Sequence, residues 1–415
     1  MSSNKLVVRK VAVLGAGVMG AQIAAHLANA KVPTVLFDLP AKEGPKNAIV
    51  EKALAALKKQ KPAPLASKTA IQYIQAANYD DDLALLGGCD LVIEAVAERL
   101  DIKENLYSKV APHLGAKTIF ATNTSGLSIE TLASVFSQEL KDRFCGVHFF
   151  NPPRYMHLVE LIACKETDAS VLDNLERFLV STLGKGVVRA KDTPNFVANR
   201  IGVFSMLATM ANAEKYDLRF DVVDDLTGAR LGRPKSATFR TADVVGLVTF
   251  AHVAKTMQDN LQADPWHAHF GLPMWLTGLI EKGLLGSKTK AGIFKKEGKR
   301  IFVLDPKAGD YVPSNEKADK AVTELLKAPT WGEKLAALRA SEHPQAQFLW
   351  ACMRDVFHYI AVHAKDIAHN ARDIDFAIRW GFGWDMGPFE IWQAAGWKQV
   401  AEWINEDIAA GKTLS

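Results

Sequence analysis

The sequence has few cysteines and no long apolar run. Its four cysteines among 415 residues form no Cys-x-x-Cys pair and no metal-type cluster. This excludes a disulfide framework, predicts buried thiols in a reducing compartment and gives no reason to expect a metal site. No apolar run approaches the ~18 residues needed to span a membrane, and the polar start MSSNKLVVRK does not fit a secretory signal peptide. These absences favour a soluble cytoplasmic protein.

The chain also lacks a strong charge of either sign. Its formal net charge is +4 and its isoelectric point is about 8.7, which gives no reason to expect a nucleic-acid partner. With 48% apolar residues, a chain of this length is expected to form two or three domains, each with its own core.

Residues 11–38 contain the clearest motif of the sequence. A short apolar run at 11–14 predicts a buried strand, and the G-x-G-x-x-G turn that follows opens an alanine-rich helix. The first glycine of such a turn permits a tight bend, the second lets the backbone approach a pyrophosphate, and the third lets the helix pack against the strand. The helix N-terminus then offers N–H groups to phosphates. The residues expected to bind the cofactor here are Gly15, Gly17, Val18, Met19 and Gly20.

Asp38 ends the second apolar strand of this stretch, about 20 positions after the first glycine. A carboxylate at this point accepts a hydrogen bond from a ribose 2′-OH and repels a 2′-phosphate. No arginine follows to receive such a phosphate, so NAD is favoured over NADP. The alternatives for the motif are a flavin site or an α/β turn that binds no nucleotide.

Alternating apolar strands and helices up to about Val188 predict an α/β, doubly wound sheet of Rossmann type. Residues 42–78 are rich in Ala, Lys and Gln and predict two helices around a break at 61–64. The further strands are expected at 90–96, 117–121, 143–150 and 158–162.

Beyond residue 191 the strand pattern stops, and the sequence predicts helices, with a small hairpin at 292–303. Two stretches resemble each other, because Asp224 and Asp375 each start a helix that leads to a glycine, Gly246 and Gly396, at similar spacing. We therefore expect an all-α C-terminal region of two tandem helical units. The expected domains are a Rossmann-type domain at 1–191, a first helical unit at 192–300, a connector at 301–344 and a second helical unit at 345–415.

His148 is the best candidate for acid–base chemistry. It ends an expected strand, and Glu160 lies in the next strand, where its carboxylate can orient an imidazole and stabilise its protonated form. Ser125 follows another strand at the same sheet edge and can hydrogen-bond a substrate oxygen. Asn199, on the first helix of the second domain, can reach the cleft from the other side. Taken singly, each of these residues has a purely structural alternative, but oxidation of an alcohol by NAD needs such a base.

Several motifs, taken in order along the chain, resemble the L-3-hydroxyacyl-CoA dehydrogenases of fatty-acid β-oxidation. The resemblance covers nearly the whole chain and implies oxidation of an (S)-3-hydroxyacyl-CoA to the 3-oxoacyl-CoA with reduction of NAD. The motifs are the glycine turn with Asp38, E-A-V-A-E at 94–98, N-T-S at 123–125, G-V-H-F-F-N-P-P at 146–153, the Val159-Glu160 pair and D-T-P-N-F-V-A-N-R at 192–200.

The resemblance assigns a role to each matching residue. It implies that His148 is the catalytic base, that Glu160 orients it, and that Ser125 and Asn199 bind the substrate. A lysine that contacts coenzyme A falls near Lys59, with Lys52 or Lys61 as alternatives. The positions expected to contact the cofactor are Asp38, Glu98, Lys103, Asn123, Ser125, Asn151 and Lys288.

The tandem helical units differ from the simple members of this family, in which one unit ends the chain. They resemble the dehydrogenase part of the larger multifunctional β-oxidation enzymes, which implies an enoyl-CoA hydratase, fused or separate, as a partner. Because a second unit can replace the partner through which simple members dimerise, we expect a monomer or a weak homodimer. Two other functions stay open: an NAD-dependent dehydrogenase of another 3-hydroxy acid, and a non-catalytic NAD-binding protein on the same fold.

Overall fold

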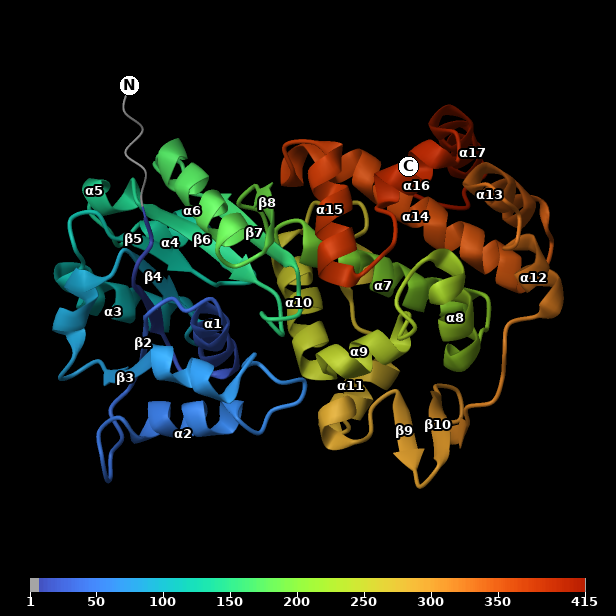
Figure 1. Ribbon diagram of the computed structural model, residues 1–415. Coiled ribbons are helices and arrows are strands. Elements are labelled where there is room, and N and C mark those ends of the chain that lie inside the picture. Colours follow the sequence, from blue (N-terminus) through green and yellow to red (C-terminus); the bar gives the residue numbers. More distant parts are fainter. Residues whose placement is uncertain (1–6, 415) are drawn as a thin grey trace. The chain divides into compact units, whose positions relative to one another are not determined.

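The computed structural model describes residues 7–414 and divides into two compact units, Met1–Phe196 and Val197–Ser415 (Figure 1). The first unit extends slightly beyond the expected boundary at residue 191. The reason is Asp192, whose carboxylate accepts hydrogen bonds from the Ser128 hydroxyl and from the backbone N–H groups of Ile129 and Glu130, at 2.8–2.9 Å. Asp192 thereby joins the end of this unit to the start of helix α4, Ile129–Ala133.

The first unit is built on an eight-stranded sheet with the order β3-β2-β1-β4-β5-β6-β7-β8. Every neighbouring pair is parallel except β6 and β7. The order reverses at β1 and β4, and ligands of open α/β sheets bind at the carboxyl ends of the strands beside such a switch point. The predicted doubly wound sheet is thus confirmed. Its strands are β1 Val11–Leu14, β2 Thr34–Asp38, β3 Ile74–Asn78, β4 Leu91–Glu94, β5 Ile119–Thr122, β6 Phe144–Phe149, β7 Leu158–Ala163 and β8 Gly186–Ala190.

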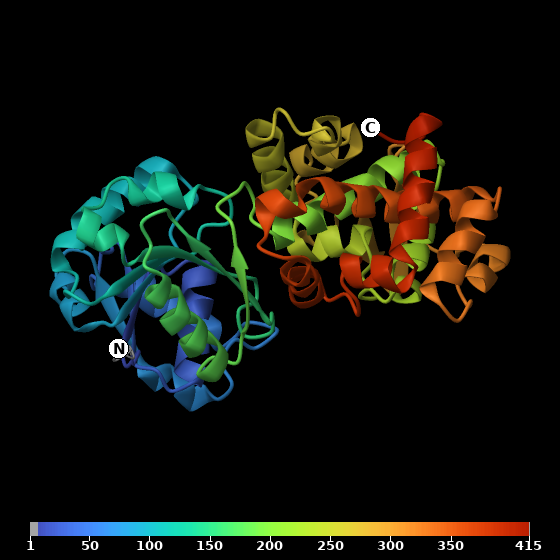
Figure 2. The ribbon, with the colours of Figure 1, turned by 90° about the horizontal axis from the view of Figure 1, so that it is seen from above.

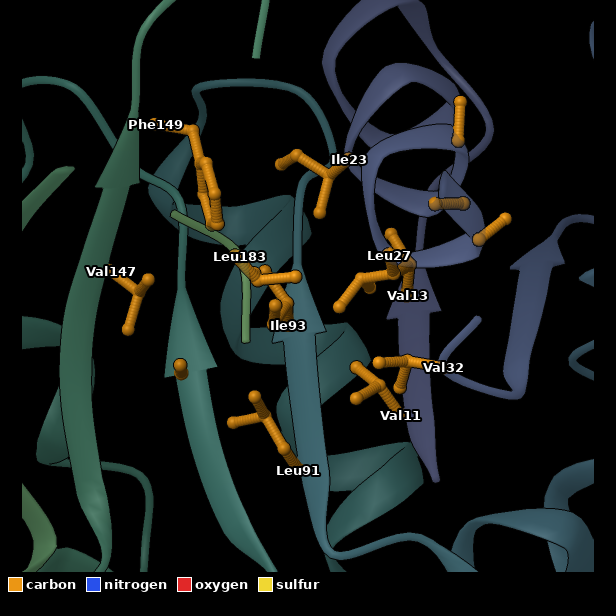
Figure 3. Packing of buried hydrophobic residues seen from close by; sticks show 14 of the residues in the cluster. Val11, Val13, Ile23, Leu27, Val32, Leu91, Ile93, Val147, Phe149 and Leu183 are labelled. Carbon is orange, nitrogen blue, oxygen red and sulfur yellow. The ribbon is translucent and has the colours of Figure 1, made fainter. Parts of the chain in front are cut away.

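Helices cover both faces of this sheet (Figure 2). The main core lies between the sheet and the helices α1, Val18–Asn29, and α6, Ala169–Ser181. In Figure 3, Ile23 and Leu27 of α1 lie over the strand residues Val13 and Ile93. Burial of such side chains stabilises the fold by roughly 1.5–3 kcal/mol each. The helices of the unit are α1 Val18–Asn29, α2 Ala48–Leu57, α3 Leu100–Val110, α4, α5 Gln138–Lys141 and α6 Ala169–Ser181, with short 3₁₀ helices η1 Lys68–Tyr73, η2 Leu83–Gly88 and η3 Ala111–His113.

The prediction of a second helix within residues 42–78 is wrong. Only the first, α2, forms; the later residues make η1 and then the edge strand β3, which pairs in parallel with β2. The segment is rich in Ala and Gln, which are good helix formers, so its composition indicates a helix. Pairing with β2 and the burial of Ile74 and Ala77 in the sheet override this local preference.

The second unit is largely helical but not all-α. The predicted hairpin forms as β9 Phe294–Glu297 and β10 Arg300–Asp305, and a third strand, β11 Asp310–Pro313, extends it to an antiparallel sheet. The expected connector from residue 301 therefore begins inside a strand. The helices of the unit are α7 Ala198–Lys215, α8 Phe220–Thr227, α9 Phe239–Val245, α10 Leu247–Asn260, α11 Met274–Glu281, α12 Lys320–Leu325, α13 Trp331–Ala340, α14 Pro344–Ile367, α15 Ala371–Phe382, α16 Pro388–Ala394 and α17 Trp397–Ala409, with short 3₁₀ helices η4 Ala229–Leu231, η5 His267–Phe270 and η6 Ser287–Thr289.

Two parts of this unit repeat the same local structure, as the sequence pattern predicted. Asp224 on α8 accepts a hydrogen bond from the backbone N–H of Phe239 at the start of α9, at 2.8 Å. Asp375 on α15 accepts one from Phe389 N–H in α16, also at 2.8 Å. In each part, a carboxylate on one helix thus holds the first turn of a following helix.

The two repeats also contact each other through equivalent positions. Gly232 and Gly383 both adopt left-handed backbone angles, with φ of +67° and +69°. Asp385 N–H donates to Gly232 O at 2.8 Å, and the Arg233 guanidinium lies 3.8 Å from the centre of the Trp384 ring. The long helices α7 and α14 pack on each other. Contact between equivalent positions is the pattern of a two-fold dimer interface, here made within one chain.

Two sequence-based expectations concern the whole chain. All four cysteines (Cys89, Cys145, Cys164 and Cys352) are free and buried, as predicted. Among residues 7–414, no helix combines the length and the apolar character needed to cross a membrane.

Candidate active site

The glycine turn between β1 and α1 has the geometry that its motif predicts. Gly15 has a φ of +102°, which L side chains rarely adopt. At Gly17, no atom lies within 4 Å of the position that a Cβ would take, so the space beside the turn is open. At Gly20, a Cβ would lie 1.8 Å from the Gly15 carbonyl oxygen, so α1 packs closely on the turn. Val18 and Met19 open the helix at the edge of this space.

Asp38 lies beside the glycine turn at the end of β2. One carboxylate oxygen accepts the Ala16 N–H at 2.6 Å and the other accepts the Leu39 N–H at 2.7 Å. A carboxylate has about four acceptor positions, and Asp38 is only half-buried, so it retains capacity for a ribose hydroxyl. The open turn, the helix N-terminus and this acid together fit a dinucleotide.

His148 and Glu160 form a buried pair across the antiparallel strands β6 and β7. They stand opposite each other in the register, and His148 Nδ1 lies 2.8 Å from Glu160 Oε2. Their side chains are only 3% and 0% exposed, and the Phe150 and Phe196 rings lie 4.5 and 5.6 Å from the imidazole. This geometry leaves Nε2 to accept a proton while the carboxylate stabilises the imidazolium.

Ser125 lies in a polar turn that follows β5 and is held by Glu98. Glu98 Oε1 accepts hydrogen bonds from the Thr124 hydroxyl at 2.5 Å and from the N–H groups of Ser125 and Gly126 at 2.8 and 3.0 Å. Burial opposes ionisation of Glu98, but the ammonium of Lys103 and these three bonds together hold its pKa below the usual range. Glu98 is therefore a carboxylate that fixes the position of Ser125.

Asn123 joins the same turn to the strand of the candidate base. Its Oδ1 accepts the Phe149 N–H at 2.8 Å, so the end of β5 is fastened to the end of β6 next to His148. Asn123 is 8% exposed. The structure thus brings Ser125, Asn123, His148 and Glu160 to one edge of the sheet.

A buried ionic network connects Glu98 to the interior of the unit. The Lys103 ammonium donates to Glu94 Oε1 at 2.6 Å and lies 3.5 Å from Glu98 Oε2. The other oxygen of Glu94 accepts from the hydroxyls of Tyr107 and Thr122, at 2.6 and 2.7 Å. Lys103 was predicted to contact the cofactor, but only 1% of its side chain is exposed. We therefore expect it to act through Glu98.

Four residues of this network and of the turn of Ser125 were not predicted from the sequence: Glu94, Tyr107, Thr122 and Thr124. One signal was available, because Glu94 ends an otherwise apolar buried strand, and a buried carboxylate needs a charged or hydrogen-bonding partner. Which partners it finds depends on how α3 packs against the sheet, and the sequence does not state that.

The remaining predicted residues lie in the loop directly after β6, on or after α2, or in the second unit. Asn151 is exposed in the loop that follows β6, and Lys52 is exposed on α2. Lys59 and Lys61 are exposed in the loop that follows α2. Asn199 lies in the first turn of α7, and Lys288 lies in η6, both in the second unit.

Comparisons with known proteins connect this geometry to a family. Residues 10–193 match the model of the 3-hydroxyacyl-CoA dehydrogenase NAD binding domain, and residues 196–296 match that of the 3-hydroxyacyl-CoA dehydrogenase C-terminal domain. The first match agrees with NAD, the cofactor that the glycine turn and Asp38 predicted.

Three relatives are similar over most of the chain or most of their own length. A probable 3-hydroxyacyl-CoA dehydrogenase of Bacillus subtilis is 42% identical, over 96% of this chain and 52% of that protein. A putative fatty acid oxidation complex trifunctional enzyme of Rickettsia felis is 34% identical, over 97% of this chain and 55% of that protein. The chain thus spans about half the length of these two relatives.

The third relative is shorter and is covered more completely. It is a probable 3-hydroxyacyl-CoA dehydrogenase of Deinococcus radiodurans, 41% identical over 70% of this chain and 83% of that protein. With both family models matched in order along the chain, this chain belongs to the 3-hydroxyacyl-CoA dehydrogenase family.

Proposed function

We propose that this chain oxidises (S)-3-hydroxyacyl-CoA to 3-oxoacyl-CoA, with NAD as the electron acceptor, in fatty-acid β-oxidation. The observation on which the proposal rests is the buried His148–Glu160 pair at 2.8 Å, in a unit that also contains the NAD motif. Oxidation of a secondary alcohol needs a base for the hydroxyl proton, and an imidazole with one nitrogen held by a carboxylate is such a base.

In the proposed reaction, His148 Nε2 takes the proton of the substrate 3-hydroxyl. Glu160 holds the ring through Nδ1 and stabilises the imidazolium that forms. The Ser125 hydroxyl, in the turn held by Glu98, donates a hydrogen bond to the substrate 3-oxygen. NAD, when bound, supplies the acceptor for the hydride that leaves C3 of the substrate. Asn199 is proposed to bind the thioester side, and the exposed lysines near 52–61 the phosphates of coenzyme A.

The direct test is reduction of acetoacetyl-CoA, followed by the loss of NADH absorbance, with NADPH and free acetoacetate as parallel substrates. We expect turnover with NADH and the CoA ester. Turnover with NADPH should be at least about tenfold slower, because Asp38 repels a 2′-phosphate and one unfavourable charge contact has roughly this effect. Equal turnover of free acetoacetate would instead indicate a dehydrogenase of other 3-hydroxy acids. NADH binding without turnover of any acyl-CoA length would indicate a non-catalytic protein.

The internal repeat leads to a prediction about assembly. Because Arg233 and Trp384 already form a dimer-like contact within one chain, we expect the purified chain to be a monomer or a weak homodimer. Light scattering after gel filtration should give a mass near 45.4 kDa at micromolar concentration. A stable dimer that persists on dilution would contradict the expectation.

Partner and location are proposals of the same kind. The name of the Rickettsia relative, a fatty acid oxidation complex trifunctional enzyme, supports an enoyl-CoA hydratase, fused or separate, as the partner. Such a hydratase would supply the 3-hydroxyacyl-CoA on which this chain is proposed to act. The four free thiols support a reducing location such as the cytoplasm.

A further inference from the structure

Helix α2 and the loop that follows it hold positive charge that is not neutralised. Lys52, Lys58, Lys59 and Lys61 are exposed, and within residues 7–414 none of them forms an ion pair. Glu51 is the single carboxylate among residues 48–61. Uncompensated charge of one sign attracts an anionic ligand, but exposed lysines alone are also typical of an ordinary solvated surface.

The loop after α2 is held in place by side chains from elsewhere in the first unit. Residues 59–66 form neither helix nor strand and include two prolines, which have no N–H to donate. The Ala63 carbonyl accepts from Arg154 Nη1 at 2.6 Å and from the Tyr155 hydroxyl at 2.9 Å, and the Leu65 carbonyl accepts from Arg154 Nη1 at 3.0 Å.

A third side chain, from a residue that precedes the loop in the sequence, also binds it. Asn29, which ends α1, donates from Nδ2 to the Pro64 carbonyl at 2.8 Å and accepts the Ala66 N–H at 2.7 Å. The carbonyls of three consecutive residues, 63–65, are therefore all bound by side chains. A loop without a backbone ladder but with this many fixed carbonyls has a defined position.

Arg154 and Tyr155 belong to the loop that directly follows β6, the strand of His148. This second loop is itself anchored, because the buried Lys185 ammonium donates to the carbonyls of Pro153 and Met156, the latter at 2.7 Å. Burial lowers the pKa of Lys185 to about 8, as expected for an ammonium that has neutral carbonyls as its partners. The loop after α2 is thus held by the loop after β6, the strand that contains His148.

We propose that Arg154 is a positioning residue that holds the basic segment, residues 58–66, where its lysines bind the phosphates of the coenzyme A tail. The proposal rests on the proposed function and names how its substrate is recognised. Only Nη1 of Arg154 is used in the bonds to the segment, and among residues 7–414 no carboxylate pairs with this guanidinium. Arg154 therefore also adds its charge to that of the lysines.

The consequence concerns the tail of the substrate. Contacts to a remote, non-reacting part of a substrate that are equally strong in the ground state and in the transition state lower KM without raising kcat. Here, the tail would bind a segment whose position is set by the loop after β6. Loss of Arg154 should weaken binding of the tail without changing the chemistry.

The experiment compares acetoacetyl-CoA with acetoacetyl-pantetheine, which lacks the nucleotide phosphates. For Arg154→Ala we expect KM for the CoA ester to rise about tenfold, while kcat stays within about twofold. KM for the pantetheine ester should stay unchanged. This is the result expected when a contact is lost that is equally strong in the ground state and in the transition state. Arg154→Lys, which keeps the charge but not the planar fork, should recover part of the loss. Arg177→Ala on α6, an exposed arginine of the same unit, is the matched control and should change nothing.

Hydrogen exchange gives a readout that does not depend on activity. In Arg154→Ala, amides within residues 58–67 should exchange at least about tenfold faster, while amides of β6 remain protected. Unchanged exchange there, or equal KM increases for both esters, would overturn the inference and leave the proposed function intact. A wild-type chain that turns over neither ester would refute the proposed function. It would then also refute the role of the basic segment in binding coenzyme A.

Discussion

Replacing His148 by Gln is expected to lower kcat with acetoacetyl-CoA by at least about 10²-fold, the usual contribution of a general base. The Gln amide can still hydrogen-bond the Glu160 carboxylate, which lies 2.8 Å from the imidazole in the native structure. It cannot exchange a proton with the substrate oxygen. Because His148 lies at the end of β6 and the glycine turn lies after β1, the affinity for NADH should stay unchanged.

The measurement pairs steady-state turnover with NADH binding followed by fluorescence. His113→Gln is the matched control, because His113 is an exposed histidine of the same unit, in η3, and its replacement should leave both quantities unaltered. Turnover of the His148 variant within a few-fold of wild type would reject the assignment. Loss of NADH binding in step with turnover would indicate a structural role for His148.

The parts of the site that depend on local chain geometry could be predicted from the sequence. One strand–turn–helix unit contains Gly15, Gly17 and Gly20, so their spacing alone predicts the role of each glycine in the turn. Asp38 belongs to the same unit, because the strand that it ends lies next to β1. The open space at Gly17 and the close contact at Gly20 agree with the local geometry expected of the turn, and binding of the cofactor by these residues stays a prediction.

The pairing of His148 with Glu160 could be predicted only in part. Both strands were expected and were expected to be neighbours, but the antiparallel register that sets the two residues opposite each other is a property of the sheet. A shift by one residue would have turned the carboxylate to the other face. The sequence therefore indicated the pair, and the sheet decides its distance.

Contacts between segments that are distant in the sequence could not be predicted from local sequence patterns. β3 has the composition of a helix and forms a strand because β2 offers it a partner. Arg154 binds a loop about 90 residues earlier in the chain, and an arginine followed by a tyrosine in a loop does not reveal this. The short strand β11 likewise depends on the presence of the hairpin beside it. These features follow from tertiary packing, which overrides local propensity.

Replacing Lys103 by Met is expected to destabilise the chain by roughly 3–5 kcal/mol, the range measured when one partner of a buried ion pair is removed. Met is close to Lys in length and adds no clash, so the effect comes from charge. Glu94 is fully buried and its closest cationic partner is the Lys103 ammonium, at 2.6 Å. Without it, the carboxylate stays in the interior with no cation within ion-pair distance among the residues that the structure describes.

Urea unfolding at neutral pH measures this effect, with Lys109→Met as the control. Lys109 is on the same helix, and its ammonium binds Asp80 at 3.1 Å, with both side chains about half exposed. Exposed pairs contribute little to stability, so the control should unfold close to the wild-type urea concentration. Equal midpoints for the two variants would contradict a stabilising role for the buried pair.

A double variant separates the two tasks that the geometry gives to Lys103. Glu94→Gln combined with Lys103→Met removes both charges, so most of the lost stability should return, because no unpaired charge is left buried. Turnover should not return with it, because Glu98 has still lost the ammonium 3.5 Å away and the turn of Ser125 is less firmly held. Recovery of stability together with full kcat/KM would show that Lys103 serves the fold alone. Recovery of stability without activity would show that the network also positions the turn in which the substrate is proposed to bind.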